Sequence, residues 1–222
     1  GVMLLAASPG GTTANLYSHL FRGDVALNIS LTAINSVLAA FTIPLITNFA
    51  INHFDADGEL GLQFGKVLQV IAIVLVPVVI GMVVRSRSES FAKSADKPVR
   101  IFSIAVLAIV AIGAILGEKE NIGDYFEQIG LLTALFCLIS LTSGYLLARG
   151  LRLGQAQAVA TSFECGIHNT TIALTIALSV LDSVPVAVPS AVYSIVMYLI
   201  ATAFGFAISR AGATHTASSS TP

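Results

Sequence analysis

One carboxylate, that of Glu164, lies inside a long apolar stretch, in a polar and glycine-containing segment over 163–171. If this stretch crosses a bilayer, a charge at its centre costs about 2.5–3.5 kcal/mol on insertion scales and needs a partner. No Lys or Arg lies at a matching depth in the sequence, so a bound cation is the simplest partner. Glu164 is therefore predicted to be a cation or proton site. The alternative is a protonated carboxyl bonded to a nearby carbonyl.

A second polar segment interrupts an apolar stretch over 8–15, where the sequence reads Ser-Pro-Gly-Gly-Thr-Thr-Ala-Asn. A helix that crosses lipid tolerates such an interruption only where the freed backbone is buried in protein or lines a cavity. A pair of interrupted helices is the best sequence indication of the binding site of a secondary transporter. The two segments therefore predict two broken helices that share one binding site.

Neutral oxygen donors near the two segments suit a hard monovalent cation. Asn15 closes the first segment, and Asn28 and Thr32, four residues apart, share one face of the following helix. We therefore predict that these three side chains bind a cation together with Glu164. For Asn28 taken alone, an interhelical hydrogen bond is an equally good interpretation.

The residues after each interruption indicate anion binding. Thr12 and Thr13 in the first segment, and Asn169 and Thr170 in the second, are good N-cap residues for a half-helix. Helix N-termini attract anions, so these four residues are the predicted contacts of an organic anion. His168 keeps three open roles: a polar ligand, a proton site or a hydrogen-bonded structural residue.

The elements that must hold these residues are membrane-spanning helices. The chain is 55% hydrophobic and only 10% charged, whereas a soluble domain carries about 25% charged residues. Apolar run lengths predict an all-α membrane protein with seven spans, of which the first and sixth are broken. The expected spans are 1–20, 24–50, 65–84, 99–116, 126–148, 154–181 and 184–209. We expect one transmembrane domain over 1–211 and a disordered cytoplasmic tail over 212–222.

Loop charges alternate along this order of spans. All of the 11 Lys and Arg residues except Lys66 and Lys119 fall on one alternating set of loops. The positive-inside rule places that set of loops and the C-terminus in the cytoplasm. We expect an integral protein of a bacterial inner membrane or of an equivalent plasma or organellar membrane. The net charge of −1 gives no indication of nucleic-acid binding.

Catalytic patterns such as His-Glu-x-x-His, Gly-x-Ser-x-Gly and Cys-x-x-Cys do not occur in the sequence. We therefore expect a transporter and not an enzyme, with a passive channel and an intramembrane enzyme as alternatives. The apolar residues 1–7 read like the second half of a helix, so we expect an N-terminally truncated chain.

Three motifs make the chain resemble the bile acid:sodium symporter family. They are Pro9-Gly10-Gly11-Thr12-x-x-Asn15, Arg22-Gly23-Asp24-Val25-Ala26-Leu27 and Glu164-x-Gly166-x-x-Asn169. The resemblance implies a fold of ten helices in two inverted repeats, in which the fourth and ninth helices are broken and cross. This chain would supply the fourth to tenth helices, with core helices over about 1–50 and 126–209 and panel helices over about 65–116.

The resemblance implies a first sodium site at Asn15, Thr32 and Glu164, completed by positions 14 and 28. Position 14 is Ala where relatives carry Ser, so one side-chain ligand is lost. Position 28 is Asn where they carry Ser, and it still offers an oxygen. The sodium ions would be transported with the substrate and not held as a prosthetic cofactor.

A second sodium site implied by the resemblance would use Glu164, the backbone carbonyls of Cys165 and Ile167, and position 168. Here position 168 is His where relatives carry Gln. Hard cations prefer oxygen ligands, so an imidazole nitrogen is a poor ligand for sodium. Proton coupling through Glu164 and His168 is therefore an open alternative at this site.

Taken together, the residues and the resemblance predict sodium-coupled import of a small organic anion by alternating access. Substrate would bind near Thr12 and Asn169, between the two half-helix N-termini. The expected partners are this anion and the lipid bilayer, with no nucleic acid and no obligatory protein partner. Proton-coupled transport of the anion is the alternative function.

Overall fold

The computed structural model describes residues 1–54, 83–95 and 122–218, and the separate positions 72, 76, 80–81, 97–98, 101–102, 105 and 109. Within these residues the chain is mostly helical, and its β-type pairing is one isolated bridge between Gly10 and His168. The expected spans over 65–84 and 99–116, and with them the expected panel helices, lie largely outside the described residues.

The first apolar stretch forms two short helices, α1 (Val2–Ala7) and α2 (Thr12–Leu20). Pro9 has no backbone N–H and favours extended backbone in the residue before it, which here is Ser8 at φ −73° and ψ 145°. The Ser8 hydroxyl donates to the carbonyl of Leu5 at 2.6 Å and so satisfies part of the helix end. The first predicted break is confirmed.

The second broken helix consists of α7 (Gln155–Gly166), α8 (Thr170–Thr175) and a π-helical turn, η1 (Ile176–Val180). Ile167 leaves the helical region at φ −110° and ψ 85°. Asn169 then precedes α8 at φ −79° and ψ 82°. The second predicted break is therefore confirmed as well.

Three long helices complete the described part: α3 (Val25–Phe54), α6 (Ile122–Gly150) and α9 (Val184–Ser218). Each contains a segment long and apolar enough to cross a membrane. These segments are Val25–Ala50, Glu127–Gly150 and Val184–Ser209, close to the expected spans. α9 continues as a helix to Ser218, where the sequence led us to expect a disordered tail from Gly212.

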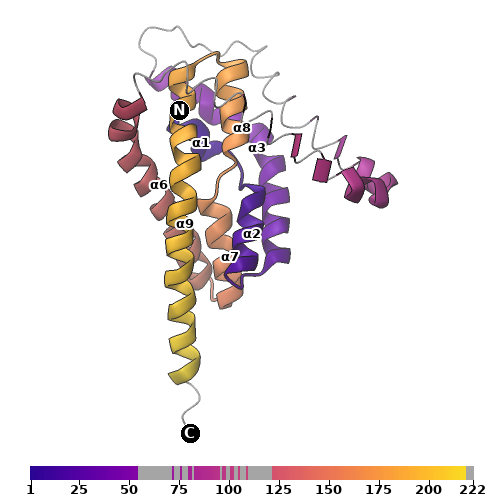
Figure 1. Ribbon diagram of the computed structural model, residues 1–222, viewed down its shortest axis with the longest axis vertical. Coiled ribbons are helices and arrows are strands. Elements are labelled where there is room, and N and C mark those ends of the chain that lie inside the picture. Colours follow the sequence, from indigo (N-terminus) through magenta and orange to yellow (C-terminus); the bar gives the residue numbers. More distant parts are fainter. Residues whose placement is uncertain are drawn as a thin grey trace.

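The broken helices lie among the long ones. α6 packs against α7 and α9, and α3 packs against α1, α2 and α7. In Figure 1, α1 lies above α2 and α8 lies above α7, so the two interruptions fall at a similar height. The fold therefore brings two chain breaks, about 160 residues apart in sequence, to one level of the bundle.

Glycines allow two of these helix contacts to be close. A Cβ on Gly144 of α6 would collide with Cys165 and with the Thr161 carbonyl of α7. A Cβ on Gly166 would collide with Leu141 of α6. Small residues are the usual means of close helix contact in a membrane, where lipid gives no hydrophobic drive to association.

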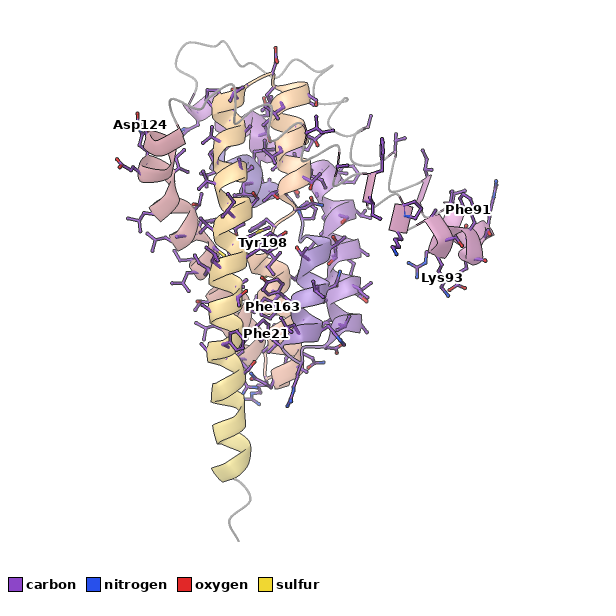
Figure 2. The ribbon with its side chains drawn as sticks, viewed as in Figure 1. Phe21, Phe91, Lys93, Asp124, Phe163 and Tyr198 are labelled. Carbon is purple, nitrogen blue, oxygen red and sulfur yellow. The ribbon has the colours of Figure 1, made fainter. Side chains whose placement is uncertain are left out.

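An aromatic cluster joins α2, α7 and α9. The rings of Tyr17 and Phe21 lie within 5.5 Å of Phe163, and Tyr17 stacks on Tyr198 at 6.2 Å between centroids. Figure 2 labels Phe21, Phe163 and Tyr198 in the middle of the bundle. The Tyr17 hydroxyl also contacts the Thr202 hydroxyl at 2.9 Å. This cluster fastens the lower half-helices of both broken helices to α9.

Large apolar side chains face outward from α3, α6 and α9. Examples with more than half of their surface exposed are Ile34, Leu45, Phe49, Leu131, Leu132, Leu199 and Phe206. A water-soluble domain rarely exposes such extended apolar surface. The outer faces of these helices therefore fit a lipid environment.

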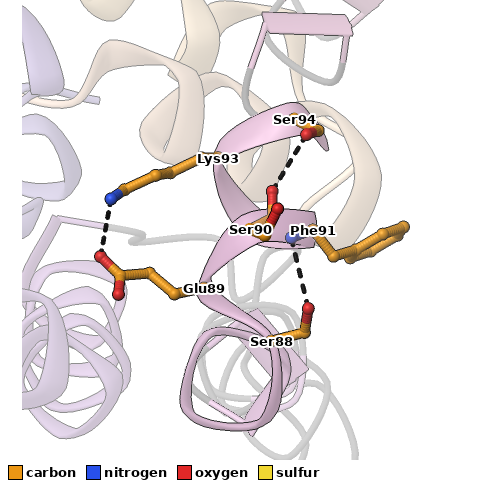
Figure 3. A network of polar contacts seen from close by, with 6 residues as sticks. All are labelled: Ser88, Glu89, Ser90, Phe91, Lys93 and Ser94. Carbon is orange, nitrogen blue, oxygen red and sulfur yellow. Dashed lines mark hydrogen bonds and ion pairs between the residues drawn. The ribbon is translucent and has the colours of Figure 1, made fainter.

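The segment 83–95, which is helical except at Ser88, carries an ordinary surface pair. Lys93 Nζ lies 2.8 Å from Glu89 Oε1, and both side chains are mostly exposed (Figure 3). Such exposed pairs contribute little stability, typically below about 1 kcal/mol.

Candidate functional site

Backbone hydrogen bonds join the two interruptions to each other. The Gly11 N–H donates to the Ile167 carbonyl at 2.7 Å, and the Asn169 N–H donates to the Pro9 carbonyl at 2.8 Å. These bonds flank the Gly10–His168 bridge. Each broken helix thus satisfies backbone groups that the other has freed, which a membrane interior requires.

The place where the two interruptions are joined is here called the crossing. Glu164 lies beside it, on the last turn of α7, and is 3% exposed. The Thr32 hydroxyl donates to Glu164 Oε2 at 2.6 Å, and Asn35 Nδ2 donates to Oε1 at 2.8 Å. Within the described residues no basic side chain forms an ion pair with this carboxylate. The site is therefore a buried carboxylate held by neutral donors from α3, and it can accept a cation.

Gly10 allows the carboxylate to lie against the first interruption. A Cβ at this position would overlap all three atoms of the Glu164 carboxyl group. Glycine is needed here for close approach and not for an unusual backbone angle.

Asn28 links three helices and is fully buried. Its Nδ2 donates to the Ser18 hydroxyl of α2 at 2.7 Å and to the Ala160 carbonyl of α7 at 2.9 Å. Because a carbonyl only accepts, the amide orientation is determined, and Oδ1 lies 3.5 Å from the Thr32 hydroxyl. Asn28 thus makes an interhelical hydrogen bond, which was one of its two interpretations from the sequence, while its oxygen faces Thr32.

Asn15 presents a buried side-chain oxygen, Oδ1, that has no hydrogen-bond partner among the described residues. A buried acceptor without a partner costs about 1–3 kcal/mol, so such atoms usually indicate a bound water or ion. This oxygen is therefore available to a ligand.

The residues predicted for a second cation site differ in what they offer. The Ile167 carbonyl already accepts from Gly11, and the Cys165 side chain packs against Gly144. His168 Nδ1 lies 3.2 Å from the Ser8 carbonyl and must therefore carry its proton. His168 Nε2 is buried without a hydrogen-bond partner in the part of the chain that the structure describes.

Two aromatic rings hold the His168 ring. It stacks on Phe136 with centroids 5.2 Å apart, and it meets Tyr193 edge-on at 5.7 Å. The Tyr193 hydroxyl donates to the Gly166 carbonyl at 2.8 Å, and Cys137 Sγ donates to the same carbonyl at 3.7 Å. These contacts fix the ring and the end of α7.

The predicted anion contacts fall at the starts of α2 and α8, but the capping prediction for Thr12 and Thr13 is wrong. Gly11 is the N-cap of α2, without a side-chain cap, and Thr12 is already the first helical residue. Asn169 does cap α8, since its Oδ1 accepts from the Ile172 N–H at 3.2 Å. Thr170 is the first residue of α8. Thr13 instead meets the Tyr198 hydroxyl at 3.5 Å.

Sequence reasoning missed Asn35 and Tyr193. Asn35 follows Thr32 by three residues and Asn28 by seven, so its helical position could have identified it. Tyr193 bonds a carbonyl 27 residues away, for which the sequence carries no local signal.

No group of three or more His, Cys, Asp and Glu side chains that could hold a metal ion occurs in the described part of the chain. The candidate site is instead one carboxylate with neutral oxygens, which suits a hard cation.

Comparison with known proteins relates the chain to sodium-dependent transporters. The family model described as Sodium Bile acid symporter family matches residues 1–124. The "Uncharacterized sodium-dependent transporter YocS" of Bacillus subtilis is 30% identical over 177 residues, which are 77% of this chain and 52% of that protein.

Two further relatives come from eukaryotes. The "Probable sodium/metabolite cotransporter BASS1, chloroplastic" of Arabidopsis thaliana is 28% identical over 78% of this chain and 42% of its own length. The human "Ileal sodium/bile acid cotransporter" is 26% identical over 78% of this chain and 50% of its own length. The chain thus spans about half the length of these relatives.

Proposed function

The chain belongs to the sodium bile acid symporter family, and we propose that the protein is a secondary active transporter that imports a small organic anion together with sodium. It is an integral membrane protein, given the family and the apolar helices. The relatives named as sodium-dependent transporters and cotransporters support sodium coupling. The same relatives support transport over catalysis.

The observation that carries this proposal is the unpaired Glu164 carboxylate at the crossing of two broken helices. A buried carboxylate with no basic partner among the described residues is balanced most simply by a bound cation. We assign the first sodium to Glu164, Asn15, Asn28 and Thr32. The unpartnered Asn15 oxygen supports this assignment.

A second sodium would lie at Glu164, the carbonyls of Cys165 and Ile167, and position 168. His168 offers only a nitrogen there, since its Nδ1–H faces the Ser8 carbonyl. Its unpartnered Nε2 favours a second candidate function, in which a proton replaces one sodium.

The anion would bind near Thr12, Thr13, Asn169 and Thr170. α2 and α8 both begin at the crossing, and first-turn N–H groups suit an anion. The Asn169 Oδ1 is occupied by the helix cap, so its side-chain amide N–H groups are the donors left for a carboxylate.

The wider architecture is part of the proposal. We take α1–α2 and α7–α8 as the corresponding broken helices of two inverted repeats, in a core over about 1–50 and 126–209 with panel helices over about 65–116. Movement of one group against the other would give alternating access. The bridge between the two interruptions supports treating both broken helices as one unit. The C-terminus would be cytoplasmic.

The test is uptake by proteoliposomes that contain the purified full-length protein. A panel of radiolabelled monocarboxylates would be offered with an inward sodium gradient, with equal sodium on both sides, and with a proton gradient alone. We expect accumulation above equilibrium only with the sodium gradient, and its loss in Glu164→Gln. Accumulation driven by protons alone would favour the second candidate. Equilibration without accumulation indicates a channel, and a chemically changed carboxylate indicates an enzyme.

A further inference from the structure

We infer that Asn35 is a positioning residue that orients the Glu164 carboxylate and thereby sets the sodium affinity of the site. This inference rests on the proposed function. Asn35 lies on α3, three residues after Thr32, so both side chains leave the same face of the helix. Each donates to a different oxygen of Glu164.

One donor on each oxygen determines how the carboxylate is turned. Asn35 Nδ2 is 2.8 Å from Oε1, and the Thr32 hydroxyl is 2.6 Å from Oε2. An ionised carboxylate only accepts, so the amide nitrogen, and not the amide oxygen, must face it. Rotation of the carboxyl group would break at least one of these bonds.

The same donors limit what else the carboxylate can bind. Its two oxygens offer about four acceptor positions. Thr32 and Asn35 each occupy one of them, and the close approach of Gly10 limits access from its side. A cation can therefore approach Oε1 only at the lone-pair position that Asn35 leaves open, so Asn35 determines the side from which it binds.

Asn35 is better suited to this role than Thr32. The Thr32 hydroxyl has other acceptors within reach, namely the Asn28 carbonyl at 3.0 Å and Asn28 Oδ1 at 3.5 Å. It can therefore turn away from Glu164 and present its oxygen to a cation. The hydrogen bond found for Asn35 in the described residues is the one to Glu164.

Asn35 is also not the sole polar link between α3 and α7. Fully buried Asn28 donates a hydrogen bond from α3 to the Ala160 carbonyl of α7. Asn35 is only half-buried, so its replacement leaves no fully enclosed cavity. Loss of its amide should consequently alter the binding of the cation more than the folding of the protein.

The test compares Asn35→Leu with wild type in sodium-driven uptake by the full-length protein. Loss of a hydrogen bond to a charged group predicts a rise of about tenfold to a hundredfold in half-saturating sodium. The maximal rate and the KM for the anion, both at saturating sodium, should change by less than about threefold. Ser30→Ala is the matched control, because Ser30 is exposed on α3 and bonds only within its own helix.

A second variant and a second measurement separate positioning from folding. Asn35→Ser also removes the reach of the amide, and it should show the same rise in half-saturating sodium and in the sodium needed for thermal stabilisation. Asn35→Gln keeps the donor and should recover part of the affinity. Unchanged half-saturating sodium in both donor-free variants, or loss of folded protein in both, overturns the inference. Neither result contradicts sodium-coupled transport by the wild type. Absence of any sodium response in the wild type overturns the proposed function as well.

Discussion

Glu164 carries the negative charge of the site, and its replacement by Gln keeps the shape of the side chain while removing that charge. We expect Glu164→Gln to abolish the stabilisation of the protein by sodium. A ligand at 100 times its dissociation constant adds about 2.7 kcal/mol to the free energy of unfolding. Thermal unfolding in detergent would be followed with sodium and with choline at constant ionic strength. An undiminished sodium effect in the variant would place the cation elsewhere.

Asn169 is proposed to bind the anion, because its side-chain oxygen caps α8 and its amide N–H groups are left as donors. We expect Asn169→Ala to raise the KM for the anion by at least about tenfold while half-saturating sodium changes little. Loss of the cap also costs about 0.5–2 kcal/mol of helix stability. Uptake titrated separately with anion and with sodium checks this. An equal loss of both affinities would contradict the division of the site into an anion part and a cation part.

At the scale of elements, the interruption in the first helix requires a glycine at position 10. We expect Gly10→Ala to displace the Glu164 carboxyl group, with loss of the sodium response and destabilisation by about 1–3 kcal/mol, as for other overpacked sites. Gly150→Ala is the control, since no atom lies within 4 Å of the added Cβ. Melting temperature and sodium-dependent stabilisation measure the two effects. Equal behaviour of the two variants would contradict the close approach of Gly10 and Glu164.

Sequence determines these elements unevenly. The breaks could be predicted because Pro9 and the glycines act locally on the backbone. The predicted N-cap of α2, Thr12 or Thr13, lies one or two residues too late, since Gly11 can itself serve as an N-cap and leaves Thr12 inside the helix. Asn35 was missed because its importance depends on Glu164, which reaches it only in the folded bundle.

At the scale of the whole molecule, the number of coupled ions sets the charge moved in each cycle. Two sodium ions with one monovalent anion would carry one net positive charge inward, and a membrane potential contributes about 2.3 kcal/mol per charge per 100 mV. A tenfold sodium gradient adds about 1.4 kcal/mol per ion. We therefore expect an inward current during uptake, recorded on a solid-supported membrane. An electroneutral cycle would instead indicate one coupled ion.

The bridge between the interruptions would couple the two proposed ligands, sodium and the anion. Asn169 is five residues from Glu164, and its N–H is fixed to Pro9, while Gly11 is fixed to Ile167. If sodium binding shifts one of the two joined interruptions, the hydrogen bonds between them would shift the starts of both half-helices. The resulting cooperativity must be reciprocal: the factor by which saturating sodium tightens the anion equals the factor by which saturating anion tightens sodium. The dissociation constants of sodium and of the anion, each measured with and without the other ligand, thus give the coupling free energy between the two sites.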